Sequence, residues 1–231
     1  MRNPEQISQI KNRITDPYSI ENFITQQDIT HLISIFYKEQ NKIYKNTGPI
    51  TLNIAPLLND SVFTKIMNKL KIEIGSFKMT AGMFFSTDFP HIVHNDDTFE
   101  LPDGVYKGIT LPLELTRNSG TEFPKLCFFD QCYFHGPAKF FNGSENVPTY
   151  YNKQVYEYSN VDGIVSEPFY DNDQLFTHLK SEWLQGLSLN STLTWQPGSA
   201  LIFDSVRLHC ASDFRKHGIT RKLGISIFTK L

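Results

Sequence analysis

A turn, a short apolar strand and a histidine follow one another in residues 197–209, which read Pro-Gly-Ser-Ala-Leu-Ile-Phe-Asp-Ser-Val-Arg-Leu-His. Pro and Gly are typical of the turn, and an apolar run of this length between turn residues is typical of a strand buried on both faces. The stretch predicts a β core in this half of the chain, with His209 just beyond one of its buried strands.

A second stretch upstream ends in two further potential metal ligands. Residues 83–96 read Met-Phe-Phe-Ser-Thr-Asp-Phe-Pro-His-Ile-Val-His-Asn-Asp, an apolar run that finishes with His94 and Asp96. Because strand side chains alternate between faces, these two residues can bind one metal while Asn95 turns away. His209 would then supply a third ligand. Two imidazoles and one carboxylate on one face of a metal leave three positions open, as in the non-haem Fe(II) oxygenases.

This ligand set competes with more ordinary interpretations. One His-x-Asp pair is weak evidence in a chain with 7 histidines, and His94 alone would more often be a hydrogen-bonded residue at a strand end. The downstream His209 and a late arginine, Arg221, favour the metal site. Asp97 competes with Asp96, but its side chain would face the other way. The remaining histidines are expected to be structural: His31, His91, His135, His178 and His217.

The amino-acid composition and net charge exclude some classes of function and partner. The chain has 231 residues, 40% of them hydrophobic, with 19 Phe and 10 Tyr, which is enough for a sizeable core rich in strands. A net charge of −2 gives no basic excess, so nucleic acid is not expected as a partner. No apolar run reaches the length of a membrane span, and 3 cysteines in no zinc-like spacing indicate a reducing compartment. We expect a soluble cytoplasmic protein with no membrane partner, and the sequence does not indicate its oligomeric state.

The chain is expected to form a single domain over residues 1–231. Residues 1–75 are predicted to form a helical layer, with an amphipathic helix over about 26–40 and a second helix starting after Asp60. Residues 75–231 are predicted to form a jelly-roll core, because short strand-like runs alternate there with Pro and Gly turns. The predicted strands are Lys71–Ile74, Lys78–Phe85, Gly108–Leu115, Lys125–Tyr133, Ser191–Trp195, Ser199–Asp204 and Lys222–Thr229.

Residues 140–190 form a predicted insertion in this core, because they combine many tyrosines with polar residues. One short helix is predicted from Asp171 to Gly186, with Phe176 and Trp183 on its inner face. An insertion between the two halves of a metal site is expected to act as a lid or substrate loop. The alternative is a surface excursion whose aromatic rings pack on the barrel.

Together these motifs resemble the Fe(II)/2-oxoglutarate-dependent oxygenases of the double-stranded β-helix fold, a jelly-roll barrel of the cupin type. In broad features they look like the phytanoyl-CoA hydroxylase and prolyl-hydroxylase branches. The resemblance covers roughly residues 75–231 and implies a mainly β protein with helices (α+β), in which N-terminal helices buttress the barrel. The residues that carry it are His94-Asn95-Asp96, residues 197–204, His209 and residues 221–228.

The resemblance implies an iron centre and a reaction. His94, Asp96 and His209 would bind Fe(II) and form the catalytic centre. The implied reaction is the oxidation, most simply the hydroxylation, of a small organic substrate, with 2-oxoglutarate and O2 consumed and succinate and CO2 released. Three alternatives stay open: a protein or peptide substrate, a desaturation or epimerisation on the same iron site, and a cupin-like binding module without catalysis.

The resemblance also implies a site for the far carboxylate of 2-oxoglutarate. The family binds it with a basic residue some way after the second histidine, and Arg221 fits this position best, since its planar fork suits a carboxylate. Lys222, on the opposite face of the strand, is the fallback. Some branches place a helper Ser where this chain has Leu223, so Thr110 is the candidate for that hydroxyl.

Overall fold

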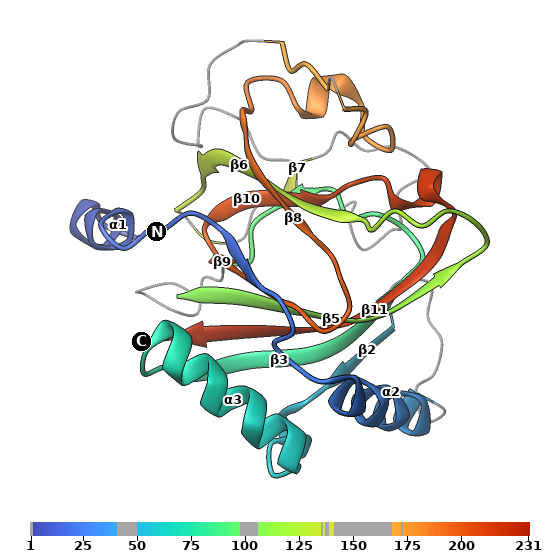
Figure 1. The fold of residues 1–231 in the computed structure, drawn as a ribbon. Coiled ribbons are helices and arrows are strands. Elements are labelled where there is room, and N and C mark those ends of the chain that lie inside the picture. Colours follow the sequence, from blue (N-terminus) through green and yellow to red (C-terminus); the bar gives the residue numbers. More distant parts are fainter. Residues whose placement is uncertain are drawn as a thin grey trace.

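Two antiparallel sheets lie face to face in the computed structural model, which describes residues 2–40, 50–97, 106–134, 136, 139–140, 168–171 and 173–231 (Figure 1). The larger sheet consists of β1 (Tyr18–Ile20), β2 (Ile50–Asn53), β3 (Lys78–Thr87), β5 (Lys107–Arg117), β9 (Ala200–Asp204) and β11 (Ile219–Lys230). The smaller sheet consists of β4 (Val93–His94), β6 (Lys125–Cys132), β7 (Lys139–Phe140), β8 (Leu189–Thr194) and β10 (Arg207–Ala211).

Most neighbouring strands in both sheets come from distant parts of the chain. The order is β1-β9-β5-β11-β3-β2 in the larger sheet and β7-β4-β10-β6-β8 in the smaller one. Every pair of neighbours is antiparallel. Two packed antiparallel sheets with these long connections form a jelly roll. The predicted fold class, a mainly β jelly roll with N-terminal helices, is confirmed.

Two helices cover the outer face of the larger sheet, and a third stands apart (Figure 1). The covering helices are α2 (Gln26–Gln40) and α3 (Ser61–Ile74), and α1 (Pro4–Lys11) lies beside the N-terminus. The predicted helix over 26–40 and the predicted start after Asp60 are confirmed. No helix in the described part of the chain is long and apolar enough to cross a membrane.

The sequence of each covering helix explains its position. Helix α2 buries Ile29, Leu32 and Phe36, whose spacing places them on one face. Helix α3 begins after Asp60, because the Asp60 carboxylate accepts a hydrogen bond from the backbone N–H of Val62. The buried faces of both helices join the side chains of the larger sheet in the main hydrophobic core.

Strand β11 runs through the middle of the larger sheet, and its side chains alternate between two environments. Leu223, Ile225 and Ile227 are buried in the core under α2 and α3. Lys222 and Ser226 occupy the alternate positions and line a cavity that is also lined by residues of the smaller sheet. The pleat of this one strand therefore decides which of its residues reach the space between the sheets.

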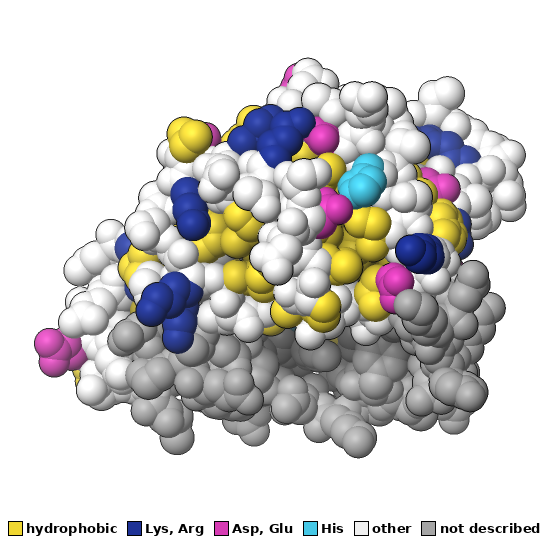
Figure 2. Space-filling view, turned by 90° about the horizontal axis from the view of Figure 1, so that it is seen from below, with side chains coloured by type: hydrophobic (Ala, Val, Ile, Leu, Met, Phe, Trp, Pro, Cys, Tyr) yellow, Lys and Arg dark blue, Asp and Glu magenta, His cyan; other side chains and the backbone are white. Residues whose placement is uncertain are grey.

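The helical side of the molecule carries charges of both signs (Figure 2). Lys and Arg side chains are scattered there among Asp and Glu side chains, with hydrophobic side chains exposed between them. One ion pair joins the two helices, since the ammonium of Lys65 lies 2.6 Å from the carboxylate of Asp28. The Lys65 side chain is 41% exposed and the Asp28 side chain 11%, and a pair that solvent still reaches from one side adds only modestly to stability. The helices are therefore held mainly by the core beneath them.

Several expectations for secondary structure need correction. All but one of the predicted strands are present, and the exception, Lys71–Ile74, forms the last turn of α3. The first 75 residues are not only helical, because β1 and β2 pair with β9 and β3 at the edges of the larger sheet. Strands β4, β7 and β10 were not predicted. The division into one domain of 231 residues stays a prediction.

The described part of the predicted insertion packs on the smaller sheet. Leu175 and Phe176 are buried there in a cluster that includes Cys127 of β6. The predicted helix from Asp171 to Gly186 is wrong: the segment forms turns and one short 3-10 helix. The helix does not form for a local reason. The Asp171 carboxylate accepts hydrogen bonds from the backbone N–H groups of Leu175 and Phe176, and such local bonds compete with a helix. The lid was predicted over 140–190; none of the described residues in that range lines the cavity, and residues 141–167 and 172 of it lie outside the described residues.

Replacement of Ile225 by Ala should lower the free energy of unfolding by about 2–5 kcal/mol, because the side chain is fully buried between β11 and the helices. The matched control is Ile72→Ala, which removes the same side chain from α3, where it is 85% exposed. The control should change stability by no more than about 0.5 kcal/mol. Urea unfolding followed by circular dichroism measures both, and equal losses would contradict the placement of Ile225.

Candidate metal centre

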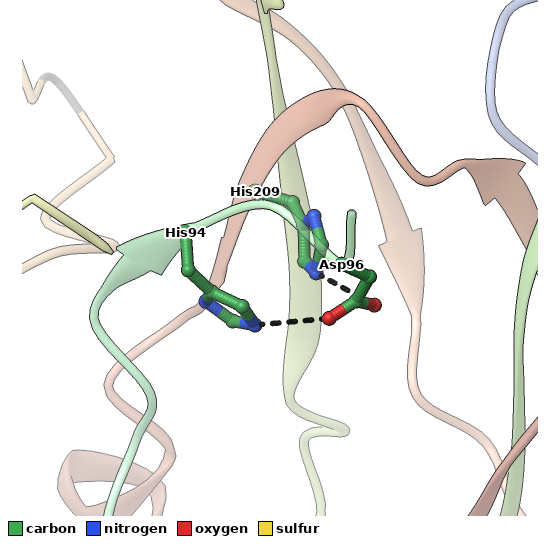
Figure 3. Close-up of side chains that lie close together, drawn as sticks. All are labelled: His94, Asp96 and His209. Atoms are coloured by element: carbon green, nitrogen blue, oxygen red, sulfur yellow. Dashed lines mark ion pairs between the residues drawn. The ribbon is translucent and has the colours of Figure 1, made fainter. Parts of the chain in front are cut away.

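The three predicted ligands converge in the structure. His94 on β4 and His209 on β10 are direct partners across the antiparallel strands, and Asp96 lies in the loop that follows β4. Their side chains turn toward one another, and the Asp96 carboxylate faces the Nε2 atoms of both rings (Figure 3). The Asp96 carboxylate oxygens lie 3.7 Å from His94 Nε2 and 3.5 Å from His209 Nε2. The ligand atoms of all three residues lie within 4.8 Å of one another, as one metal ion requires.

Backbone carbonyls fix the tautomers of both histidines. Nδ1 of His94 lies 2.7 Å from the carbonyl oxygen of Ile92, and Nδ1 of His209 lies 3.0 Å from that of Arg207. A carbonyl can only accept, so each Nδ1 carries a proton, and each Nε2 faces the Asp96 side, where it offers a lone pair to a metal once it has lost its own proton. Metal-binding histidines are commonly oriented in this way by a hydrogen bond at the second nitrogen.

Packing holds the His209 ring in place. Its centroid lies 4.7 Å from the ring centroid of Phe203 and 5.6 Å from that of Phe128. Phe203 in turn closes over Gly108, where an added Cβ would lie 2.6 Å from the Phe203 ring. Gly108 therefore leaves the space in which Phe203 supports His209.

The charge state of Asp96 suits a metal ligand. Burial works to raise the pKa of its carboxyl group. The nearby His209, through its charge and its hydrogen bond, and the charges of His94 and His91 outweigh burial, so the pKa lies below its usual value. The carboxylate is therefore ionised near neutral pH and offers an anionic oxygen between two imidazole nitrogens.

The three residues open onto a cavity of about 200 Å³. Its wall is mainly apolar and includes Met83, Phe85, Leu126, Trp195, Phe203 and Phe228. His91 also lines it, although a purely structural role was expected for this residue. Thr110, the predicted helper hydroxyl, also lines the cavity. It lies opposite Ser226 of β11, which lines the cavity as well.

Lys222 is the cationic side chain in the cavity lining. The residue is only 4% exposed, and its ammonium group lies 5.0 Å from the ring centroid of Trp195 and 4.8 Å from that of Phe214. No carboxylate among the described residues forms an ion pair with it. Burial lowers the pKa of Lys222 to about 7, although the charge of Cys127 acts in the opposite direction. The cavity thus contains a cation whose charge has no protein counter-ion in the described structure.

Arg221 points away from the cavity, so the expected orientations of Arg221 and Lys222 are reversed. The Arg221 guanidinium donates to the hydroxyl of Tyr37 on α2 and lies 3.8 Å from the carboxylate of Glu114. The Tyr37 hydroxyl itself donates to Glu114 over 2.8 Å. The physical reason is the pleat, which places Arg221 in the same row as Leu223, on the side of the helices.

The other histidines have separate surroundings. His31 lies 2.8 Å from the Asp60 carboxylate at the start of α3, and His217 lies 2.8 Å from that of Glu122. His178 is half-buried, and its burial lowers its pKa to about 4. His135 lies outside the described residues. None of these three described histidines belongs to the ligand cluster.

Comparison with known proteins gives a likeness in structure alone. No protein-family model and no curated protein sequence matches the chain. The non-heme alpha-ketoglutarate-dependent epimerase SnoN from nogalamycin biosynthesis superposes with a TM-score of 0.53 at 13% identity, over 98% of this chain and 84% of SnoN. HygX from Streptomyces hygroscopicus, solved with nickel and 2-oxoglutarate bound, gives 0.52 at 11% identity, over 99% of this chain and 87% of HygX. The carbocyclase SnoK, also alpha-ketoglutarate-dependent and from nogalamycin biosynthesis, gives 0.52 at 11% identity, over 98% of this chain and 83% of SnoK.

The chain has the fold of these proteins. The resemblance inferred from the sequence is therefore supported at the level of the fold. At such low identities, arguments about chemistry depend on the residues of this chain.

Lys222 is the residue that reaches the cavity, although the sequence analysis named it only as the fallback to Arg221. A signal for this was present in the alternation of β11, where Leu223, Ile225 and Ile227 form an apolar row and Arg221 continues that row. Trp195 and Phe214, which flank the Lys222 ammonium, carried no such signal. Both come from connections whose paths depend on tertiary packing.

Replacement of Asp96 by Ala should abolish tight binding of a divalent metal, because it removes the anionic ligand between the two histidines. Calorimetric titration of the metal-free protein with Co(II) measures this directly. His217→Ala is the control, since His217 pairs with Glu122 outside the cluster and its loss should leave Co(II) binding unchanged. Undiminished Co(II) binding by the Asp96 variant would show that the metal lies elsewhere.

Proposed function

We propose that this chain is an Fe(II)- and 2-oxoglutarate-dependent dioxygenase that oxidises, in the simplest case hydroxylates, a small organic molecule. One observation carries the proposal: a single cavity contains both the His94, Asp96 and His209 cluster and the buried ammonium group of Lys222. The competing binding module without catalysis required the three predicted ligands to lie apart, and they lie together.

The donor atoms fit Fe(II). Two imidazole nitrogens with free lone pairs and one ionised carboxylate are the ligands of the two-histidine, one-carboxylate sites that bind this metal. His94, Asp96 and His209 would hold the iron. When bound, iron together with O2 and 2-oxoglutarate supplies the oxidising power, and 2-oxoglutarate leaves as succinate and CO2.

Lys222 fits the far carboxylate of 2-oxoglutarate, the role first assigned to Arg221. A buried cation without a partner is unfavourable, and an incoming carboxylate supplies that partner. The rings of Trp195 and Phe214 shield the ammonium group from water, which strengthens its attraction for an anion. The hydroxyl of Thr110 is available in the same cavity to donate a further hydrogen bond.

The apolar lining supports a small molecule as the second substrate. Met83, Leu126 and Phe228 offer contact surface, and His91 offers a polar group beside His94, with their ring centroids 5.7 Å apart. SnoN has been solved in complex with Fe3+, alpha-ketoglutarate and nogalamycin RO, which is a precedent for a small substrate in this fold. SnoN is an epimerase and SnoK a carbocyclase, so epimerisation and ring closure are the alternatives to hydroxylation.

The decisive experiment is the formation of succinate from 2-oxoglutarate by the purified protein with Fe(II) and O2, first alone and then with a panel of small metabolites. We expect slow succinate formation without substrate and faster formation with one class of metabolite. No succinate from an iron-loaded protein under any condition would contradict the proposal, and stimulation by peptides alone would redirect it to a protein substrate.

Lys222→Met should weaken binding of 2-oxoglutarate by roughly tenfold to more than a hundredfold, because a charge-assisted hydrogen bond contributes about 1.5–3 kcal/mol. Arg221→Ala is the matched control: it removes the neighbouring cation, which contacts Tyr37 and Glu114 instead. Its affinity for 2-oxoglutarate should stay within about twofold of the wild type. The dependence of succinate formation on 2-oxoglutarate concentration measures both, and the opposite pattern would restore Arg221 to the role.

Binding of 2-oxoglutarate should weaken as the pH rises above 7. The free protein loses the Lys222 proton near pH 7, whereas the bound dianion favours the ammonium form. The dissociation constant should therefore rise by about tenfold per pH unit above that pKa. Titration of the Mn(II)-loaded protein between pH 6.5 and 8.5 measures this slope. Lys222→Arg keeps its charge throughout and should give a flat profile, and a flat wild-type profile would argue against Lys222 as the anion-binding group.

A further inference from the structure

Successive residues of the loop that carries Asp96 are held by strand pairing and hydrogen bonds. His94 is held by its strand pairing with His209, and the Asn95 side-chain amide donates to two backbone carbonyls. The backbone N–H of Asp96 donates to the carbonyl oxygen of Ser205 over 2.8 Å. These bonds come from the strands and connections of the barrel itself, and they set the path of the chain up to the metal-binding carboxylate.

The next residue, Asp97, is held from outside the barrel. Its side chain is fully buried and receives both arms of the Arg2 guanidinium. Arg2 Nη2 donates to Asp97 Oδ1 over 2.8 Å, and Arg2 Nη1 donates both to Asp97 Oδ2 and, over 2.8 Å, to the carbonyl oxygen of Phe134. The Arg2 side chain is itself only 6% exposed. This two-armed contact fixes the Asp97 carboxylate in position and direction.

The N-terminal segment that carries Arg2 is anchored independently of this contact. Ile10 of α1 is buried in a cluster with Phe134 and Val206, and Val206 directly follows the residue that binds the Asp96 N–H. Further along, the Thr15 backbone N–H donates to the carboxylate of Asp204 over 2.8 Å. Figure 1 shows α1 standing beside the two sheets instead of over the larger one. The segment therefore brings Arg2 to Asp97 from a fixed support.

We propose that Arg2 is a positioning residue of the metal centre, which acts through Asp97 to hold the Asp96 carboxylate between His94 and His209. The inference rests on the proposed function, because it takes these three residues to be metal ligands. Asp96 and Asp97 share one peptide unit, so a rotation of the Asp97 backbone also turns Asp96. Arg2 thereby makes the N-terminal segment a part of the centre, although it touches none of the ligands.

Loss of Arg2 should release the loop that carries Asp96 from its fixed position. Without Arg2, the buried Asp97 carboxylate loses both hydrogen bonds that the guanidinium donates, which is unfavourable, so the Asp97 side chain would shift toward water. This shift releases the loop next to Asp96, whose carboxylate oxygen lies only 3.5 Å from His209 Nε2 in the intact arrangement. Partners that orient metal ligands typically account for about 10–100-fold in metal affinity.

The test compares the affinity of the metal-free protein for Co(II) in four variants by calorimetric titration. Arg2→Ala should weaken Co(II) binding by about 10-fold or more. Arg2→Lys keeps the charge but not the two-armed contact and should give an intermediate loss. Arg13→Ala is the matched control, because it removes an arginine of the same segment whose guanidinium lies over the Tyr106 ring and not on Asp97, and it should bind Co(II) as the wild type does.

The fourth variant, Arg2→Ala with Asp97→Asn, separates positioning from stability. It removes the buried charge, so its Tm should return toward the wild-type value, whereas Co(II) binding should stay weak because residue 97 is no longer held. Recovery of both quantities together would overturn the proposal and leave a purely structural ion pair. Co(II) binding by Arg2→Ala within twofold of the wild type would also overturn it. Failure of the wild type to bind Co(II) would instead refute the metal centre itself.

Discussion

The pairing of His94 with His209 across two antiparallel strands is the contact on which the candidate site depends. Strand β4 is only two residues long, and it lies between β7 and β10. So short a strand has little stability of its own, and its position is set by β10, every residue of which is buried. The candidate metal ligands are thus held by the smaller sheet, while the cation of the cavity comes from the larger one. The site exists only because the two sheets face each other.

The charged groups at this site, together with a bound metal and a bound dicarboxylate, would balance one another. In the cavity, one carboxylate, Asp96, lies with two imidazoles, and one ammonium group, Lys222, lies against aromatic rings. A divalent metal and a dicarboxylate ligand would add two positive and two negative charges, so the complete assembly would be neutral. Burial of a neutral set costs much less than burial of any single member. This favours binding of the metal and the dianion together, because each compensates the charge that the other brings.

The sequence could predict that His94, Asp96 and His209 lie together, because the signal for their placement is local. Two side chains two residues apart share a face of a strand, and a Pro-Gly turn before an apolar run locates the strand that leads to His209. The choice between Arg221 and Lys222 failed because adjacent residues of a strand differ only in the face they occupy, and this depends on which row packs under the helices. Asp171 shows a second limit, since its hydrogen bonds to Leu175 and Phe176 replace a helix that the spacing of apolar residues predicted. Arg2 could not have been found at all, because nothing in its surroundings links it to a residue so far along the chain.

The position of β11 has a consequence for how the protein is made. This strand comes after every other strand in the chain, yet it lies between β3 and β5 in the larger sheet. On the ribosome, the facing edges of β3 and β5 must wait with unpaired backbone groups until the last strand emerges. Such edges are prone to pair with other chains. The larger sheet can therefore close only after β11 has been made, and a nascent chain stalled before β11 is the form that most needs a chaperone.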